Sequence, residues 1–361
     1  MFERRLLRHL DWPLLVALVL LCGIGLMQIY SATGGATRLY VTQIYGILLG
    51  LAGLGVCLAI DYRTLADKSL LIFGGLLLLL VYVLFFGELG GGSRRWINLG
   101  AFNLQPSEFA KAGLALVLAK FFGERARGAG WPGTLAVVGA ITLVPMVLIA
   151  RQPDLGTAVT LLPVLAAVVF MAGIPLRALG VVALVGVLAA PVVWQFGLAD
   201  YQRERVSTFL APEQDPQGAG YQQIQARITV GSGGVWGKGF QQGTQGQLRF
   251  LPVAQNDFIF SVLAEERGFA GVVVALGLYL FVILRSFDSA RLARDRVGAF
   301  LVLGVAAGFA FQVVYNITMS AGLAPVKGLT LPLMSSGGSS VIATLVGFGL
   351  ILSVRMRRFT N

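Results

Sequence analysis

The stretch Ser69-Leu-Leu-Ile-Phe-Gly-Gly-Leu-Leu-Leu-Leu-Leu-Val-Tyr-Val-Leu-Phe-Phe-Gly87 contains no charged residue. A helix needs about 20 mostly apolar residues to cross the hydrocarbon core of a bilayer, and this stretch meets that requirement. The rest of the chain has the same character, since 56% of its residues are hydrophobic, only 12% are charged and its mean hydropathy is +0.79. A soluble domain carries about 25% charged residues. The sequence therefore predicts an integral membrane protein.

Similar apolar stretches recur along the whole chain. The predicted membrane helices cover residues 12–30, 42–60, 69–87, 107–122, 133–150, 155–173, 176–196, 258–284, 297–320 and 338–354. The stretch 107–122 is the least typical, because Glu108 and Lys111 lie in its first turns. We expect an all-α integral membrane protein with about ten transmembrane helices, forming one polytopic domain over residues 1–361.

Basic residues between these stretches predict the orientation, because cytoplasmic loops carry an excess of Lys and Arg. They lie before the first stretch, in alternate connections and after the last stretch: Arg4, Arg5, Arg8, Arg63, Lys68, Lys120, Arg125, Arg127, Arg177, Arg285, Arg291, Arg294, Arg296, Arg355, Arg357 and Arg358. Both termini are then cytoplasmic, and residues 87–106 and 197–256 are extracytoplasmic. Long connections are often functional, so we expect function at the outer face, above all in the large loop 197–256.

Composition and motifs exclude several classes of function. The chain has a single histidine, His9, and two cysteines, Cys22 and Cys57, both within apolar stretches. These numbers argue against His-based catalysis, a disulfide framework and a Cys/His zinc or haem site. No phosphate-binding P-loop is present, which argues against an ATP-driven pump. The net charge of +11 follows from topology, so no nucleic-acid partner is expected.

Asp257 is the outstanding acidic residue, because it lies where the large outer loop meets an apolar stretch. One interpretation is a helix N-cap, a position that Asp favours and that would lower its pKa. The other is a catalytic carboxylate. Glu265, Glu266 and Arg267 follow in the same stretch and are expected to form an internal charge cluster.

Ionisable residues within a span are functional candidates by default. Glu108 and Lys111 are three residues apart and share a helix face. They are either a structural ion pair, or a site in which Lys111 faces an anionic ligand and Glu108 orients it.

Other polar groups gather near the predicted outer face. Gln312, Tyr315, Asn316 and Ser320 form a stripe expected to hydrogen-bond between helices. The run Ser335-Ser-Gly-Gly-Ser-Ser340 either receives a phosphate or permits close packing, and Asp154 is expected to cap the helix that follows it.

Four motifs, in order and spanning nearly the whole chain, resemble the SEDS family (shape, elongation, division and sporulation), and within it the RodA type. The first motif is Gly92-Ser-Arg-Arg-Trp-Ile-Asn-Leu-Gly with Gln105-Pro-Ser-Glu-Phe-Ala-Lys111, and the second is Arg151-Gln-Pro-Asp-Leu-Gly-Thr157. The third comprises Arg205-Val-Ser-Thr-Phe, Gly231-Ser-Gly-Gly-Val-Trp-Gly-Lys-Gly-Phe240 and Asp257-Phe-Ile-Phe-Ser-Val-Leu-Ala-Glu-Glu266. The fourth comprises Asn316 and Ser335-Ser-Gly-Gly-Ser-Ser340. Two positions depart from the family pattern, Asn256 where Thr or Ser is expected and Ser336 where many members have Tyr.

The resemblance implies ten helices and a peptidoglycan glycosyltransferase that polymerises lipid II at the outer leaflet of the bacterial cytoplasmic membrane during cell elongation. It implies a class B penicillin-binding protein as transpeptidase partner, besides membrane lipids. Asp257 matches the catalytic acidic residue of the family and Glu108 and Lys111 its intramembrane pair, while Trp96 and Lys238 match other motif positions near the expected cavity.

In the reaction that we expect, Asp257 accepts the proton of the GlcNAc 4-hydroxyl as its oxygen attacks the anomeric carbon linked to undecaprenyl pyrophosphate, with inversion. Lys111, Lys238 and Arg94 are candidate cations for the pyrophosphate, and a divalent cation of unknown identity is a candidate cofactor. Two alternatives stay open at this point, a lipid II flippase and a non-catalytic scaffold for the penicillin-binding protein.

Overall fold

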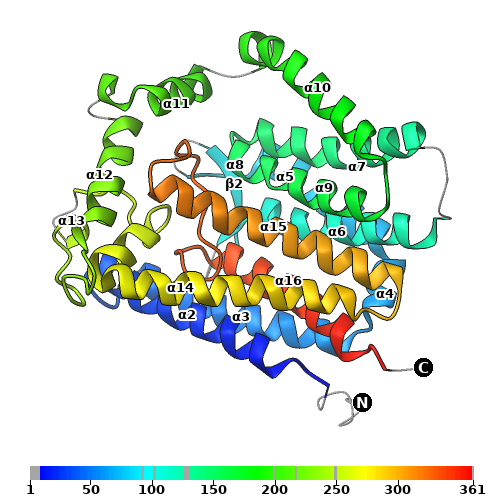
Figure 1. Ribbon diagram of the computed structural model, residues 1–361, viewed down its shortest axis with the longest axis horizontal. Coiled ribbons are helices and arrows are strands. Elements are labelled where there is room, and N and C mark those ends of the chain that lie inside the picture. Colours follow the sequence, from blue (N-terminus) through cyan, green and yellow to red (C-terminus); the bar gives the residue numbers. More distant parts are fainter. Residues whose placement is uncertain are drawn as a thin grey trace.

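A computed structural model describes residues 9–90, 93–100, 103–125, 131–197, 200–215, 218–247 and 250–359 (Figure 1). Each of the ten predicted spans corresponds to one helical segment of the structure. The segments are α2 (Trp12–Ala32), α3 (Arg38–Ala59), α5 (Ser69–Phe86), α6 (Pro106–Glu124), α7 (Trp131–Arg151), α8 with α9 (Leu155–Val159 and Leu161–Met171), α10 (Leu176–Val192), α14 (Ile259–Arg291), α15 (Arg296–Ser320) and α16 (Gly338–Met356). The predicted all-α membrane fold is confirmed.

The centre of the bundle is built from α15 and α16. The helix α16 packs along α3, and α15 packs against both α6 and α14 (Figure 1). Glycines permit these close approaches, since a Cβ atom on Gly46 would lie 2.9 Å from the Gly338 Cα atom, and one on Gly25 would lie 2.6 Å from the Met334 Cα atom. Small residues at helix contacts are typical of membrane proteins.

The two ends of the described chain lie at the same end of the bundle (Figure 1). Ion pairs hold this end together: the buried Asp11 carboxylate lies 2.9 Å from Arg285 and 3.0 Å from Arg355. Arg63, in the short helix α4 (Tyr62–Asp67), pairs with Asp295 at 2.8 Å. This is the end that the basic residues predict to be cytoplasmic. Arg4, Arg5, Arg8 and Arg127 lie outside the described residues.

The outer connections contain structure that the sequence did not predict. The first forms a small antiparallel sheet of β1 (Glu88–Gly90), β2 (Ser93–Asn98) and β3 (Asn103–Leu104), in that order. In the large loop, α10 continues into a π-helical turn, η1 (Val193–Gly197), and then come α11 (Asp200–Leu210), the 3₁₀ turn η2 (Pro212–Gln214), α12 (Ala219–Ser232) and α13 (Thr244–Gln247). These helices arch from α10 to α14 (Figure 1).

The helix α14 is broken at Gly268, where φ is 62° and ψ is −164°. Only glycine adopts such a conformation without strain. A Cβ atom there would also lie 2.3 Å from the backbone nitrogen of Gly237, so the large outer loop packs directly on the break. Residues 259–267 therefore form a short outer helix that carries the segment of Asp257, and the membrane-spanning part follows.

Candidate active site

A cavity of about 760 Å³ opens among the outer ends of the helices. Its lining comes from α3, the small sheet, the beginnings of α6 and α8, the segment before α14 and the connection between α15 and α16. The residues that matter below are Glu88, Arg95, Trp96, Glu108, Asp154, Asp257 and the stretch Ser336 to Ser340. Parts of the chain that are distant in sequence thus meet in one polar chamber.

Asp257 does not cap α14. The N-cap residue of that helix is Phe258, and no side chain donates or accepts a capping hydrogen bond there, so the capping interpretation is wrong. Asn316 of α15 holds the segment in place, because its amide nitrogen donates to the backbone oxygen of Asp257 at 2.9 Å and to that of Leu329 at 2.6 Å. Within the described ranges, no donor is hydrogen-bonded to the Asp257 carboxylate.

Burial raises the pKa of Asp257 to about 6, although the nearby cations Arg205 and Arg95 act to lower it. Removal from water disfavours the charged form of a carboxyl group. A carboxylate whose pKa lies near neutrality and whose oxygens have no hydrogen-bond donor is suited to accept a proton from a ligand in the cavity.

Asp154 is a second carboxylate in the same chamber. It accepts a hydrogen bond from the Thr157 backbone nitrogen at 3.1 Å and so caps α8, as predicted. It also accepts from the Gln105 side chain at 3.0 Å and lies 4.0 Å from the Arg95 guanidinium. Burial raises the pKa of Asp154, and the nearby Arg95 guanidinium acts to lower it. The predicted helix cap is confirmed, and Asp154 in addition lines the cavity of Asp257, which the sequence analysis did not predict.

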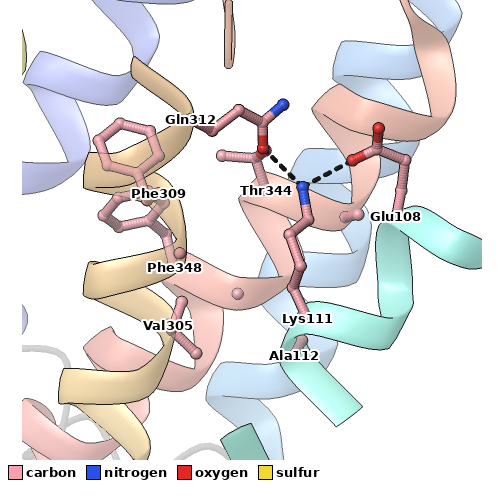
Figure 2. Close-up of a pocket in the computed structure, with 11 residues that line it drawn as sticks. Glu108, Lys111, Ala112, Val305, Phe309, Gln312, Thr344 and Phe348 are labelled. Carbon is pink, nitrogen blue, oxygen red and sulfur yellow. Dashed lines mark hydrogen bonds and ion pairs between the residues drawn. The ribbon is translucent and has the colours of Figure 1, made fainter. Parts of the chain in front are cut away.

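The predicted pair Glu108 and Lys111 is an ion pair, with 2.7 Å between Lys111 Nζ and Glu108 Oε2 (Figure 2). Lys111 Nζ also donates to Gln312 Oε1 at 2.6 Å, and the Gln312 amide donates to the Thr330 backbone oxygen at 3.0 Å. Glu108 lines both the large cavity and a smaller pocket of about 30 Å³, whereas Lys111 lines only the smaller pocket, together with Phe309 and Phe348. Two of the three N–H donors of the Lys111 ammonium are thus bonded to protein groups.

Of the other predicted site residues, one lines the cavity and two lie outside it. Trp96 lines the cavity. Arg94 does not; it is exposed and donates to the Phe85 backbone oxygen at 3.1 Å. Lys238 also lies outside the cavity, with its Nζ atom 2.7 Å from the Glu265 carboxylate. Asp257, Glu108 and Trp96 therefore share one chamber, while Glu265 of α14 pairs with Lys238 of the outer loop outside that chamber.

Three basic residues near the site were missed by the sequence analysis. Arg95 lines the cavity, and Arg205 of α11 donates to the Val326 backbone oxygen at 3.4 Å. Lys327 lies over the Tyr315 ring, and burial together with Arg205 lowers the pKa of Lys327. Arg205 begins one of the quoted motifs, so a signal was present, but only the fold shows that α11 lies near Asp257.

The polar stripe and the Ser-Gly run both hold the chamber together. The predicted interhelical hydrogen bonding of the stripe is confirmed for Gln312, which accepts from Lys111 of α6, whereas Asn316 donates to the connecting segments before α14 and α16. Gln43 of α3 donates to the Ser335 backbone oxygen at 3.1 Å and accepts from the Gly337 nitrogen at 3.0 Å. The run therefore packs closely, as one interpretation had it, while residues 336–340 face the cavity.

The described residues contain no group of three or more His, Cys, Asp and Glu side chains that could hold a metal ion. No three of the described carboxylates that line the cavity form such a group. A bound divalent cation would therefore need oxygens from its ligand in addition to those of the protein.

Comparison with known proteins assigns the chain to a family. The model of the FtsW, RodA and SpoVE cell cycle proteins matches residues 9–359. The chain is 37% identical to the peptidoglycan glycosyltransferase MrdB of Escherichia coli K12, covering 97% of this chain and 94% of that one. It is 32% identical to the peptidoglycan glycosyltransferase RodA of Treponema pallidum, with 96% and 98% covered.

Two solved structures are similar over nearly the full length. A chain of a peptidoglycan synthase complex that coordinates polymerization and crosslinking has a TM-score of 0.84 and 36% identity, with 98% of this chain and 99% of that chain covered. The rod shape determining protein RodA of Thermus thermophilus has a TM-score of 0.74 and 33% identity, with 98% of each chain covered. The chain therefore belongs to the family of cell cycle proteins that comprises FtsW, RodA and SpoVE.

Proposed function

We propose that this multi-pass protein of the bacterial cytoplasmic membrane, a peptidoglycan glycosyltransferase, polymerises lipid II into glycan strands in the cavity around Asp257. The observation that carries the proposal is the Asp257 carboxylate itself. It is half-buried, has a pKa that desolvation raises to about 6 and faces a chamber of about 760 Å³ at the outer end of the bundle. Relatives with 32–37% identity are named peptidoglycan glycosyltransferases.

Asp257 acts as the general base. It takes the proton of the GlcNAc 4-hydroxyl while that oxygen forms a bond to the anomeric carbon of the growing strand. The bond from the anomeric carbon to undecaprenyl pyrophosphate breaks, the pyrophosphate leaves with the electron pair, and the carbon inverts. General-base assistance of this kind contributes about 10²–10⁴-fold to a rate.

The leaving pyrophosphate needs positive charge beside it. The geometry favours Arg95 and Arg205 for this role, because both lie close enough to Asp257 to lower its pKa. Lys111, Lys238 and Arg94 are less suited, since the first lines only the smaller pocket and the other two lie outside the cavity. A divalent cation, if it takes part, would be held by carboxylates that line the cavity and would add positive charge beside the pyrophosphate.

The glycan strand would be cross-linked by a class B penicillin-binding protein bound to this chain. The similarity to a subunit of a peptidoglycan synthase complex that couples polymerization to crosslinking supports such a partner. A flippase would need a polar path through the bundle. Here the floor beneath Glu108 is a pocket of only about 30 Å³ lined by Phe309 and Phe348, which favours chemistry over transport.

The first test replaces the base. Asp257→Asn keeps the shape of the side chain and removes its basicity, so we expect glycan polymer from purified chain and lipid II to fall by about 10²-fold or more. Asp200→Asn is the matched control, because that carboxylate on α11 is fully exposed, and it should polymerise like the wild type. If a folded Asp257→Asn variant made as much glycan polymer as the wild type, the proposal would be contradicted.

A further inference from the structure

A second cavity, of about 400 Å³, lies between α2 and α14 and shares no lining residue with the chamber of Asp257. Most of its wall is apolar, formed by Ile24, Met27, Leu263, Ala270 and Val274. These residues belong to the last turns of α2 and to the part of α14 around its break. By the predicted orientation, they lie in the outer half of the membrane.

The upper end of this groove carries a cation, Arg267. The Arg267 guanidinium lies 5.6 Å from the centre of the Phe240 ring, over its face. No acidic side chain in the described part of the chain forms an ion pair with it. The carboxylate of the neighbouring Glu266 accepts hydrogen bonds from the Ser31 hydroxyl and, at 3.2 Å, from the Gln241 backbone nitrogen.

The groove also contains a buried polar group without a partner. The Gln28 side chain is 1% exposed, and its Oε1 atom accepts no hydrogen bond from the described residues. A buried acceptor left without a donor costs free energy. Above it, Trp236 borders the groove with 82% of its surface exposed. Tryptophan favours the level of lipid headgroups, so the rim marks the membrane interface.

We propose that this groove binds one anionic phospholipid of the outer leaflet. The phosphate pairs with Arg267, whose planar guanidinium suits phosphate oxygens. A headgroup hydroxyl donates to Gln28, and an acyl chain lies along Ala270 and Val274. The volume is that of a small-ligand site, about 300–1,000 Å³. A partner helix that spans the membrane needs about 20 residues and does not fit it.

Glycine shapes the groove for this occupant. Gly271 lies one turn below Arg267, and a Cβ atom there would be 2.2 Å from the Arg267 Cβ atom. The absence of that atom leaves room for the arginine stem along the helix. The guanidinium can then lie at the interface, while the wall below it stays open to a lipid chain.

Native mass spectrometry of the full-length chain tests the proposal, with phosphatidylglycerol added in detergent. We expect one retained phosphatidylglycerol. Arg267→Gln should weaken its binding about tenfold, because a charge-assisted hydrogen bond is lost. Ala270→Phe keeps the cation but fills the groove, and it should abolish retention. The control Arg177→Gln removes an exposed arginine at the predicted cytoplasmic end of α10 and should bind like the wild type.

Two further lipids distinguish the sources of phosphate. Phosphatidylcholine has no net negative charge and should be retained weakly. Polyprenyl phosphate has the phosphate but no headgroup hydroxyl, and it should compete poorly. The proposal is overturned if both groove variants retain phosphatidylglycerol as the wild type does, or if polyprenyl phosphate is the lipid whose retention depends on Arg267.

Discussion

At the scale of single residues, the position of Asp257 depends on Asn316. One amide nitrogen on α15 bridges two backbone oxygens, those of Asp257 and Leu329. These residues belong to the two segments that close over the cavity, one before α14 and one before α16. The side chain that aligns the proposed base therefore comes from a helix far away in sequence.

Asn316→Ala should lower both stability and turnover. Removing the amide leaves two carbonyls without this donor, at a cost of about 1–3 kcal/mol each when buried. Thermal unfolding and lipid II polymerisation would be measured together, with Thr318→Ala as control. The Thr318 hydroxyl bonds only backbone oxygens of its own helix. An Asn316→Ala variant with wild-type turnover would show that the clamp does not align Asp257.

The sequence analysis predicted the acidic residues of the site better than its basic residues. Glu108 and Asp257 are conspicuous because charge is rare next to apolar stretches. Arg94 and Arg95 could not be told apart, since consecutive strand residues point to opposite faces and β2 was not predicted. In the structure Arg95 turns to the segment before α8, donating to the Gln152 backbone oxygen at 3.1 Å, and Arg94 turns away.

At the scale of elements, Glu265 joins the outer part of α14 to the large outer loop. Its carboxylate is fully buried and accepts hydrogen bonds from Lys238 Nζ at 2.7 Å, Thr244 Oγ1 at 3.2 Å and the Gln245 backbone nitrogen at 3.1 Å. The motif around Lys238 is thus the anchor of the outer loop on the broken helix. The structure favours this role over contact with substrate.

Lys238→Met should destabilise the chain by about 3 kcal/mol, because it leaves a buried carboxylate without its cation. The double variant Lys238→Met with Glu265→Gln should be less destabilised than the sum of the two single changes, since the residues interact directly. Protease cleavage of the outer loop reports the effect. If Lys238→Met instead raised the KM for lipid II with no loss of stability, Lys238 would be a substrate ligand.

Element positions were predictable and element details were not. All ten spans follow from hydropathy, which integrates over many residues. The break in α14 depends on one glycine, Gly268, among 47, and its conformation is fixed by the loop that packs on it. The small sheet β1–β3 has strands of only two to six residues, too short for alternation to stand out.

At the scale of the whole molecule, the fold collects charge at one end. The segment before α14 brings Asp257, β2 brings Arg95, α11 brings Arg205 and the N-cap of α8 brings Asp154, and the last three influence the pKa of Asp257. Burial and Asp154 raise this pKa, whereas the two arginines lower it. The chemistry of the proposed base is therefore a property of the assembled bundle.

The pH dependence of polymerisation by the purified chain tests this account most directly. Asp257 must be ionised to accept a proton, and its ionised fraction rises with pH and reaches one half at pH about 6. Turnover should therefore fall as pH drops through about 6 and level off above it. Arg205→Gln removes a cation that lowers the pKa, so the acid limb should move to higher pH. Turnover independent of pH across this range, with an Arg205→Gln profile identical to the wild type, would contradict Asp257 as the general base.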